Sequence, residues 1–355
     1  MNPILVSSTA ESTGKTAVAL ALGRHAADSG RAVGYMKPRG TRLQSAVGKT
    51  LDRDPMVARE VLDLDEEMHE MEPIVYSPTF VEDAIRGRED VDALRESVRE
   101  SYEAVAADKD LVVLEGAGEY TTGGIIELTD PDLADLLDAR VLLVVEYDEP
   151  TDVDGVLAAA DAFGDRLGGV LFNGVSDEEF DQLTGDVVPF LEGRGVRVFG
   201  ALPAVQALAG VTVAELAAEL GADVLTEDAP TDAFVERFLV GAMGRDAALS
   251  GFRRTRDAAV ITGGDRSDIQ TAALEAPGVR CLLLTGGHRP TGAVVGNAEE
   301  AGVPILLVQG DTRTTIDRAE AVVRSGRTPD AESVARMGDL LADSTDVPAI
   351  LALSE

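Results

Sequence analysis

Ser8-Thr9-Ala10-Glu11-Ser12-Thr13-Gly14-Lys15-Thr16 follows the apolar run Ile4-Leu5-Val6 and opens an Ala- and Leu-rich stretch that ends near Gly30. A strand, a loop ending in Gly-Lys-Thr and a helix form the context that a phosphate-binding P-loop requires. The free N–H groups and the partial positive charge at the start of such a helix favour phosphate. We therefore expect Lys15 to neutralise the β- and γ-phosphates of a nucleoside triphosphate and Thr16 to join the coordination shell of Mg²⁺.

The strict P-loop pattern has a glycine where this chain has Thr9, so an ordinary strand–turn–helix is the alternative interpretation. A second Gly-Lys-Thr, at 48–50, follows neither a strand nor a glycine-rich loop, and we interpret it as a surface turn. The nucleotide-binding residues predicted around the first loop are Thr13, Gly14, Lys15, Thr16 and Ala17.

Short apolar runs alternate with helical patterns over the first two hundred residues, which is typical of a mostly parallel sheet with helices on both faces. One buried helical stripe is predicted by the spacing of Leu94, Val98, Tyr102 and Val105. The further predicted strands are 32–36, 111–114, 141–145, 169–173 and 196–199, after which 200–203 is expected to leave the sheet. The pattern predicts an α/β fold, a P-loop domain with a doubly wound sheet.

The alternation of apolar runs and helical patterns changes after Pro203, so we place a domain boundary near residue 206. Thr212 and Glu215 form a capping-box pattern at the start of a short helix from Val213 to Leu220. Three strand-plus-loop units then follow at 259–264, 282–287 and 305–310, and the first two share Thr-Gly-Gly. We predict a P-loop domain over 1–205, a second, smaller α/β domain over 206–327 and a C-terminal helical tail over 328–355.

The charge balance is strongly acidic: 64 Asp and Glu residues stand against 31 Lys and Arg residues, for a net charge of −33. The acidic residues are spread over the chain, which disfavours an acidic interaction tail. An acidic surface adapted to concentrated salt, as in a halophile, explains them better because salt screens self-repulsion. The same charge disfavours nucleic-acid binding, which depends on neutralising phosphates.

The remaining composition indicates a cytoplasmic protein without a membrane partner, because there is no signal peptide and no apolar stretch of about 18 residues. Cys281 lies in an apolar run and is interpreted as a buried strand thiol rather than a nucleophile. His25, His69 and His288 are scattered and show no metal-binding spacing. The sequence leaves a homo-oligomer open.

The P-loop resembles that of dethiobiotin synthetases, G-T-D-T-E-V-G-K-T, which also has Thr at the position of Thr9. The likeness continues, in the family's order, through Tyr35-Met36-Lys37-Pro38, Asp54, Glu115-Gly116-Ala117-Gly118, Phe172-Asn173-Gly174 and Gly200-Ala201-Leu202-Pro203. These matches cover about 200 residues and support a nucleotide-binding P-loop over the ordinary strand–turn–helix.

The resemblance implies specific roles for these residues. Thr16, Asp54 and Glu115 would gather around Mg²⁺, which prefers oxygen ligands, and Asp52 is an alternative to Asp54. Lys15 and Lys37 would be catalytic, flanking the transferred phosphoryl group. The family further implies nucleotide contacts from Asn173, which would meet the adenine, and Pro203, and contacts with a substrate carboxylate from Gly116, Ala117 and Gly118.

The second half resembles a DRTGG domain in four segments, 240–243, 261–268, 284–287 and 302–304. A dethiobiotin-synthetase-like domain followed by a DRTGG domain is the N-terminal arrangement of long phosphotransacetylases. Gly264, Asp265 and Arg266 are a candidate anion site, with tight turns and a structural Asp265–Arg266 pair as the alternative.

Two functional hypotheses follow. The first is a Mg–ATP-binding protein with a regulatory or sensory role, acting on a protein partner of acyl-CoA or acetate metabolism. The second is an ATP-dependent ligase that phosphorylates a carboxylate or a carbamate. Phosphotransacetylase activity is not expected from these two domains by themselves.

Overall fold

The computed structural model describes residues 2–41, 43–46, 49–205, 208, 210–241, 244–324 and 329–355. The chain forms two compact units. The first contains Met1–Leu208 and Thr328–Glu355, and the second contains Ala209–Arg327. The boundary that we predict near 206 and the one at 327 to 328 lie outside the described residues, as do Gly48 of the second Gly-Lys-Thr and Ala242 and Met243 of the segment 240–243.

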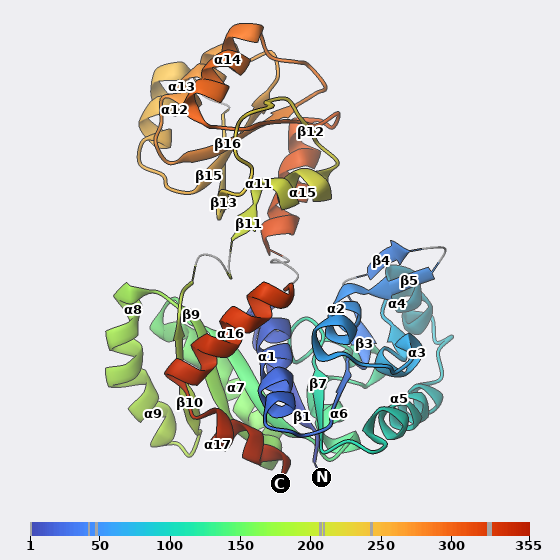
Figure 1. Ribbon diagram of the computed structural model, residues 1–355. Helices are drawn as coiled ribbons and strands as arrows, with labels where there is room; N and C mark the ends of the chain where they lie inside the picture. The colour runs from blue at the N-terminus through green and yellow to red at the C-terminus, as the bar shows by residue number, and fades with distance from the viewer. Residues whose placement is uncertain are drawn as a thin grey trace. The chain divides into compact units, whose positions relative to one another are not determined.

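The first unit is built on a six-stranded, wholly parallel sheet with the strand order β10-β9-β8-β1-β7-β2 (Figure 1). Its strands are β1 (Ile4–Ser8), β2 (Val33–Met36), β7 (Leu111–Glu115), β8 (Arg140–Glu146), β9 (Leu167–Val175) and β10 (Val198–Pro203). Two small ribbons accompany it, β3 (Arg39–Gly40) with β6 (Ile74–Val75), and β4 (Leu43–Ala46) with β5 (Lys49–Asp52). The carboxyl ends of the parallel strands share one edge, which is where ligands bind in such sheets.

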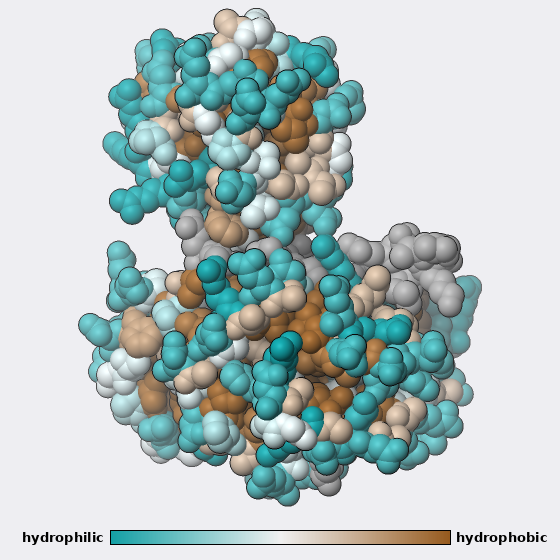
Figure 2. All heavy atoms as spheres, in the orientation of Figure 1, coloured by the Kyte–Doolittle hydropathy of each residue, from teal (hydrophilic) through white to brown (hydrophobic). Residues whose placement is uncertain are grey.

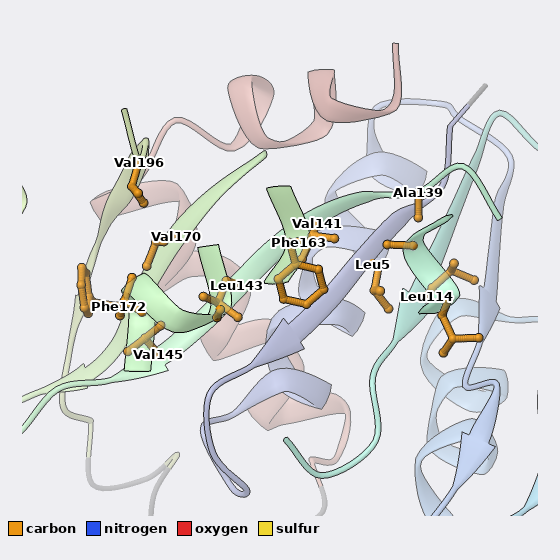
Figure 3. Close-up of a cluster of buried hydrophobic side chains, with 14 of the residues drawn as sticks. Leu5, Leu114, Ala139, Val141, Leu143, Val145, Phe163, Val170, Phe172 and Val196 are labelled. Atoms are coloured by element: carbon orange, nitrogen blue, oxygen red, sulfur yellow. The ribbon is translucent and has the colours of Figure 1, made fainter. Parts of the chain in front are cut away.

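Helices cover both faces of this sheet, as a doubly wound fold requires. They are α1 (Lys15–Asp28), α2 (Arg53–Leu62), α3 (Met68–Met71), α4 (Pro78–Ile85), α5 (Val91–Ala106), α6 (Asp130–Leu136), α7 (Val153–Phe163), α8 (Asp177–Gln182), α9 (Val188–Glu192), α16 (Ala331–Ser344) and α17 (Val347–Leu351). Alternate strand residues point to opposite faces. Leu5, Leu143 and Phe172 therefore join the core on the side of α7 (Figure 3), whereas Val6 and Leu142 join the core on the side of α1.

The C-terminal segment, which we expect to be a helical tail, is part of the first unit. Helix α16 lies alongside the P-loop helix α1 (Figure 1), and the His25 ring bonds Gly338 O at 2.9 Å. Its buried side chains, with those of α17, belong to the α1 core; they are Val334, Met337, Leu341, Val347, Ile350 and Leu351. The last 28 residues therefore complete the P-loop unit.

The second unit is a smaller α/β fold around the sheet β12-β17-β16-β15-β14, in which β14 to β17 are parallel and β12 is antiparallel. Its strands are β11 (Val211–Thr212), β12 (Asp223–Val224), β13 (Phe234–Val235), β14 (Arg237–Val240), β15 (Ala258–Gly263), β16 (Val279–Thr285) and β17 (Ile305–Leu307). Its helices are α11 (Val213–Leu220), α12 (Arg245–Phe252), α13 (Ser267–Leu274), α14 (Gly292–Ala301) and α15 (Thr312–Arg324). One core lies beneath α12, α13 and α14, and another beneath α11 and α15.

The structure confirms two local predictions, a helix cap and a buried cysteine, and corrects one about the last strand of the first sheet. The capping box at Thr212 and Glu215 is confirmed, and so is the burial of Cys281, where burial raises the thiol pKa to about 12. Residues 200–203 do not leave the sheet: β10 continues to Pro203, and a shift in its pairing with β9 between Val198 and Gly200 accommodates the glycine. Glycine and proline are tolerated here because they lie towards the end of an edge strand.

Hydrophilic residues cover much of the face shown in Figure 2, with hydrophobic residues in smaller patches between them. Among the described residues, no helix is both long and apolar enough to cross a membrane.

Candidate nucleotide and metal site

The P-loop connects β1 to α1 and is braced by the end of β9. Gly14 has a left-handed conformation, with φ of +84°, and a Cβ atom there would clash with the amide of Asn173. That amide donates a 2.8 Å hydrogen bond to Thr13 O. Gly14 is thus required both by its backbone angle and by the close approach of Asn173.

Lys15 folds back across the loop rather than into solvent. Its Nζ donates to Ser8 Oγ at 2.7 Å and to Gly118 O, which lies beyond the end of β7. Burial lowers the pKa of Lys15, and the carboxylates of Glu115 and Asp130 oppose that shift. Lys15 therefore lies beside the loop that follows β7, where the negative charges of Glu115 and Asp130 act on its ammonium group.

Thr16 and Glu115 are joined directly. The Thr16 hydroxyl donates a 2.7 Å hydrogen bond to Glu115 Oε1, and the Tyr35 hydroxyl donates one of 2.6 Å to Oε2. Burial, followed by the charge of Asp54, raises the pKa of Glu115 to about 7, although Lys37 and the two hydroxyls oppose this. Glu115 can therefore gain or lose a proton near neutral pH, and a cation would favour the carboxylate form.

Lys37 lies among three carboxylates. Its backbone N–H donates to Met71 O at 2.8 Å, and its side chain is only 2% exposed. Nζ lies 3.0 Å from Asp52 Oδ2 and 3.7 Å from Glu115 Oε1, and it forms a hydrogen bond with Asp54 Oδ2. Burial lowers the pKa of Lys37, but the charges of Asp54, Glu115 and Asp52 outweigh it and raise the pKa above its usual range.

Asp52 and Asp54 have different tasks in this cluster. Asp52 caps α2 by accepting a 2.8 Å hydrogen bond from the Asp54 N–H, and its Oδ2 accepts one of 2.7 Å from the Thr41 N–H. The Asp52 N–H donates in turn to Glu72 Oε2 at 2.7 Å. Both oxygen atoms of Asp52 accept hydrogen bonds from the local backbone, besides the contact of Oδ2 with Lys37, which supports Asp54 as the metal-ligand candidate of the two.

Glu72 is a buried carboxyl that sequence reasoning did not find. Burial raises its pKa to about 7, and the charge of Asp52 adds to this, whereas the Asp52 N–H opposes it. Its Oε1 is buried without a hydrogen-bond partner among the described residues, and a Cβ on Gly40 would collide with it. A protonated Glu72 suits this environment because a neutral carboxyl costs less to bury.

Arg39 and Asp130 form a second buried ion pair that was also missed. Arg39 is 0% exposed and pairs with Asp130 Oδ1 while donating to the carbonyl groups of Thr122 and Leu128. Asp130 Oδ2 accepts a hydrogen bond from Ser7 in β1. Arg39 therefore holds residues 122–130, the segment that follows the Gly116–Gly118 loop, against the sheet.

The residues present fit a divalent cation with oxygen ligands. Thr16, Glu115 and Asp54 offer a hydroxyl and two carboxylates, which is the kind of partial shell that Mg²⁺ completes with water and phosphate. The described residues contain no group of three or more His, Cys, Asp or Glu side chains that could hold a metal ion by themselves. With Glu72 protonated, the ionised carboxylates of Asp52, Asp54 and Glu115 outnumber the ammonium groups of Lys15 and Lys37 by one, so the buried cluster favours an added cation.

The other predicted residues of the first unit lie at the same edge of the sheet. Gly116 follows β7, and a Cβ atom at this position would collide with the Asp130 carboxylate. Gly118 has a φ of +62°, and its carbonyl oxygen accepts the hydrogen bond from Lys15. Ala17 lies in the first turn of α1, and Pro203 ends β10. The structure brings the predicted lysines, Thr16, Asp54 and Glu115 together, and the contacts of all the predicted site residues with a ligand stay predictions.

The candidate anion loop of the second unit has a different arrangement. The Gly264 N–H donates to Thr285 O at 3.2 Å, and the Gly286 N–H donates to Gly310 O at 2.8 Å. The Arg266 guanidinium forms an ion pair with Asp268, Nε to Oδ1 at 3.2 Å. The Gly264 amide thus bonds within the protein, and the anion site at Gly264, Asp265 and Arg266 stays a prediction.

Comparison with known families fits this architecture. A family model described as an AAA domain matches residues 2–225, well over half of the chain. The chain belongs to this AAA-domain family. A second model, described as a DRTGG domain, matches residues 215–322, so that the P-loop AAA domain is followed by a DRTGG domain.

Individual relatives are more distant. The chain is 25% identical over 343 residues to phosphate acetyltransferase of Haemophilus influenzae, covering 85% of this chain and 46% of the relative. It is 29% identical over 225 residues to cobyric acid synthase of Syntrophobacter fumaroxidans, covering 57% and 43% respectively. The chain spans about half the length, or less, of these curated relatives. A crystal structure of the CBS and DRTGG domains of Clostridium perfringens pyrophosphatase, complexed with diadenosine tetraphosphate, has a TM-score of 0.28 at 17% identity, covering 43% of this chain and 73% of that one.

Proposed function

We propose that the AAA domain binds Mg–ATP and that the DRTGG domain has a regulatory or sensory role that depends on the bound nucleotide. The protein would act on a partner in acyl-CoA or acetate metabolism. The observation that carries this proposal is the convergence of Lys15, Thr16, Lys37, Asp54 and Glu115 at the carboxyl edge of the parallel sheet. Two lysines and two carboxylates that are far apart in the sequence meet where a P-loop presents its phosphate-binding turn.

Each residue has a physical task in this proposal. Lys15 and the start of α1 would neutralise the β- and γ-phosphates, and Asn173 would hold the loop and face the adenine. Thr16, Asp54 and Glu115 would hold Mg²⁺, which, when bound, would offset the negative charge of the phosphates. Lys37 would stabilise charge on the γ-phosphoryl group.

Thermal unfolding in molar KCl tests the nucleotide proposal. ATP with Mg²⁺ should raise the melting temperature of the wild-type protein by linkage. Lys15→Ala should remove that shift because the phosphates lose their buried point charge. Lys109→Ala is the matched control, since Lys109 forms an ion pair with Glu66 away from the P-loop. An undiminished ATP shift in Lys15→Ala would refute the P-loop assignment.

The regulatory part of the proposal is supported by the chain connectivity. The DRTGG domain lies in the sequence between β10, which ends at the candidate residue Pro203, and α16, which packs on α1. Both connections therefore lead to elements beside the nucleotide site. The names of the phosphate acetyltransferase relatives support a partner in acetyl-group metabolism.

Coupling between the domains can be measured with a chain in which residues 211–324 are replaced by a Gly/Ser linker. If the DRTGG domain regulates the site, the ATP affinity of this chain should differ from that of the full chain by roughly 5- to 150-fold, as is typical of allosteric coupling. Equal affinities by isothermal titration in the same molar-salt buffer would refute regulation and leave ATP binding intact.

A second candidate function is an ATP-dependent ligase that phosphorylates a carboxylate or carbamate. The second buried lysine favours it, because Lys37 lies beside the proposed metal ligands, where a transferred phosphoryl group would need charge stabilisation. Steady ADP release in molar KCl, screened with amines and carboxylates, distinguishes the ligase from the sensor, which should bind ATP without such turnover.

A further inference from the structure

The ammonium group of Lys37 lies where several carboxylates converge. Asp52 and Asp54 come from the start of α2, and Glu115 comes from the end of β7. Nζ contacts all three of them, and the side chains of the four residues are at most 2% exposed. Lys37 therefore supplies positive charge to the same buried oxygen atoms that a metal ion would need.

Two of these three carboxylates, Asp54 and Glu115, are the proposed metal ligands. A divalent cation bound to them would lie close to the Lys37 ammonium, and like charges about 4 Å apart repel strongly where water is excluded. The same oxygen atoms therefore cannot bind the ammonium group and the metal ion tightly at the same time. A lysine side chain has a flexible four-carbon stem with rotatable donors, so it can exchange one anionic partner for another.

We propose that Lys37 competes with the divalent cation for Asp54 and Glu115, so that the metal binds tightly only when the γ-phosphate of a bound nucleotide draws the ammonium away. This inference rests on the proposed Mg–ATP function. Its consequence is that metal and nucleoside triphosphate bind with positive coupling, because the phosphate removes the competing charge and the metal removes the ammonium's former partners.

The alternative is that Lys37 is a permanent part of the carboxylate cluster. Its charge would then hold Asp52, Asp54 and Glu115 together, and its removal would leave mutually repelling carboxylates that bind a metal no better. The two possibilities predict opposite effects of removing the ammonium while the rest of the side chain is kept.

The test compares the wild type with Lys37→Met. Calorimetry in molar KCl measures the affinity of each protein for Mn²⁺ or Mg²⁺ without nucleotide. Methionine keeps an unbranched stem and removes the charge. The variant should bind the metal at least about tenfold more tightly, since a unit charge near the metal is lost. Lys109→Met removes an ammonium paired with Glu66, Nζ to Oε1 at 2.6 Å, and should leave metal affinity unchanged. Lys37→Arg keeps the charge and should show no such gain.

A folded Lys37→Met protein with unchanged or weaker metal affinity would overturn the inference. If that variant does not fold, Lys37→Gln, which keeps hydrogen-bond donors but removes the charge, decides the question: metal affinity no tighter than that of the wild type would overturn the inference. Failure of the proposed function looks different, because then the wild type would show no ATP-dependent thermal shift at all.

Discussion

The Thr16 hydroxyl donates its proton to Glu115 Oε1 across 2.7 Å, joining the first turn of the P-loop helix to the end of β7. Because the hydrogen points to the carboxylate, the lone pairs of Thr16 Oγ1 remain available to a cation. Tyr35 fixes the other oxygen of Glu115 at 2.6 Å, so the carboxylate is held from both sides. This hydrogen-bonded chain fixes the positions of Thr16 and Glu115, two of the residues that would hold Mg²⁺.

Glu115→Gln should weaken Mg²⁺ binding in the presence of ATP by roughly 10- to 100-fold, because a carboxylate that binds or orients a metal becomes a neutral amide. Its effect on nucleotide affinity at saturating Mg²⁺ should be much smaller. Mg²⁺ titrations followed by calorimetry measure both. Glu119→Gln, in an exposed position of the neighbouring loop, is the control. A Glu115→Gln titration that matches the wild type would place Glu115 away from the metal.

Asp130→Asn should destabilise the first unit by about 3–5 kcal/mol, because it leaves the fully buried guanidinium of Arg39 without its counter-charge. Urea unfolding in molar KCl measures the loss. Arg166→Met provides the comparison, since Arg166 pairs with Asp138 at the surface, where such a pair contributes about 1 kcal/mol or less. Similar losses in the two variants would mean that the Arg39–Asp130 pair has no special importance.

The sequence predicted the residues that follow strands far better than the buried charges that support them. Lys15 could be placed because it ends the loop that joins an apolar run to a helix, and Lys37 and Glu115 because the family motifs that contain them come directly after apolar runs whose carboxyl ends share one edge of a parallel sheet. Arg39 and Asp130 are 91 residues apart and lie among ordinary charged residues, so no periodicity distinguishes them. Their partnership depends on how residues 122–130 fold back, which only tertiary structure determines.

Glu72 should make the stability of the protein fall as pH rises from about 4.5 to about 7, measured in EDTA without nucleotide. Burial raises the pKa of Glu72 to about 7, above its ordinary value of 4.5. Between these values the folded state holds a proton that the unfolded state has released, so folding is favoured at lower pH and the benefit is lost as pH rises.

The measurement is the urea midpoint across this pH range in molar KCl, compared for the wild type and Glu72→Gln. The variant carries a permanently neutral side chain and should show a shallower fall. Glu60→Gln, an exposed carboxyl on α2, should reproduce the wild-type curve. If Glu72→Gln also does so, Glu72 does not hold this proton.

Lowering the salt concentration should destabilise the protein. With a net charge of −33, self-repulsion is screened in molar KCl, where the Debye length is about 3 Å, but not at 0.01 M, where it is about 30 Å. The melting temperature should therefore fall steadily as KCl is removed, and sucrose, which does not screen charge, should not replace the salt. A melting temperature that is constant from molar to millimolar KCl would refute the halophilic interpretation.

The apolar face of α16 illustrates the limit of sequence reasoning in another way. Val334, Met337 and Leu341 recur at helical spacing, which predicts a helix with one buried side. The pattern does not say which surface covers that side. Because the DRTGG domain lies between this segment and the P-loop domain in the sequence, the sequence predicts a C-terminal helical tail but not its packing on α1, which only tertiary structure determines.

A chain that ends at residue 324 should therefore fail to form a stable P-loop unit, although every predicted nucleotide-binding residue lies before the cut. It loses the buried side chains of α16 and α17, each worth about 1.5–3 kcal/mol, from a unit whose total stability is expected to be about 5–15 kcal/mol. The chain in which only residues 211–324 are replaced by a linker keeps both helices and should unfold cooperatively and bind ATP. Met337→Asp in the full chain makes the same test without a deletion, since it buries a charge against α1, whereas Arg336→Asp, at an exposed position of the same helix, should be tolerated. Cooperative unfolding and normal ATP binding by residues 1–324 would show that the C-terminal helices are dispensable.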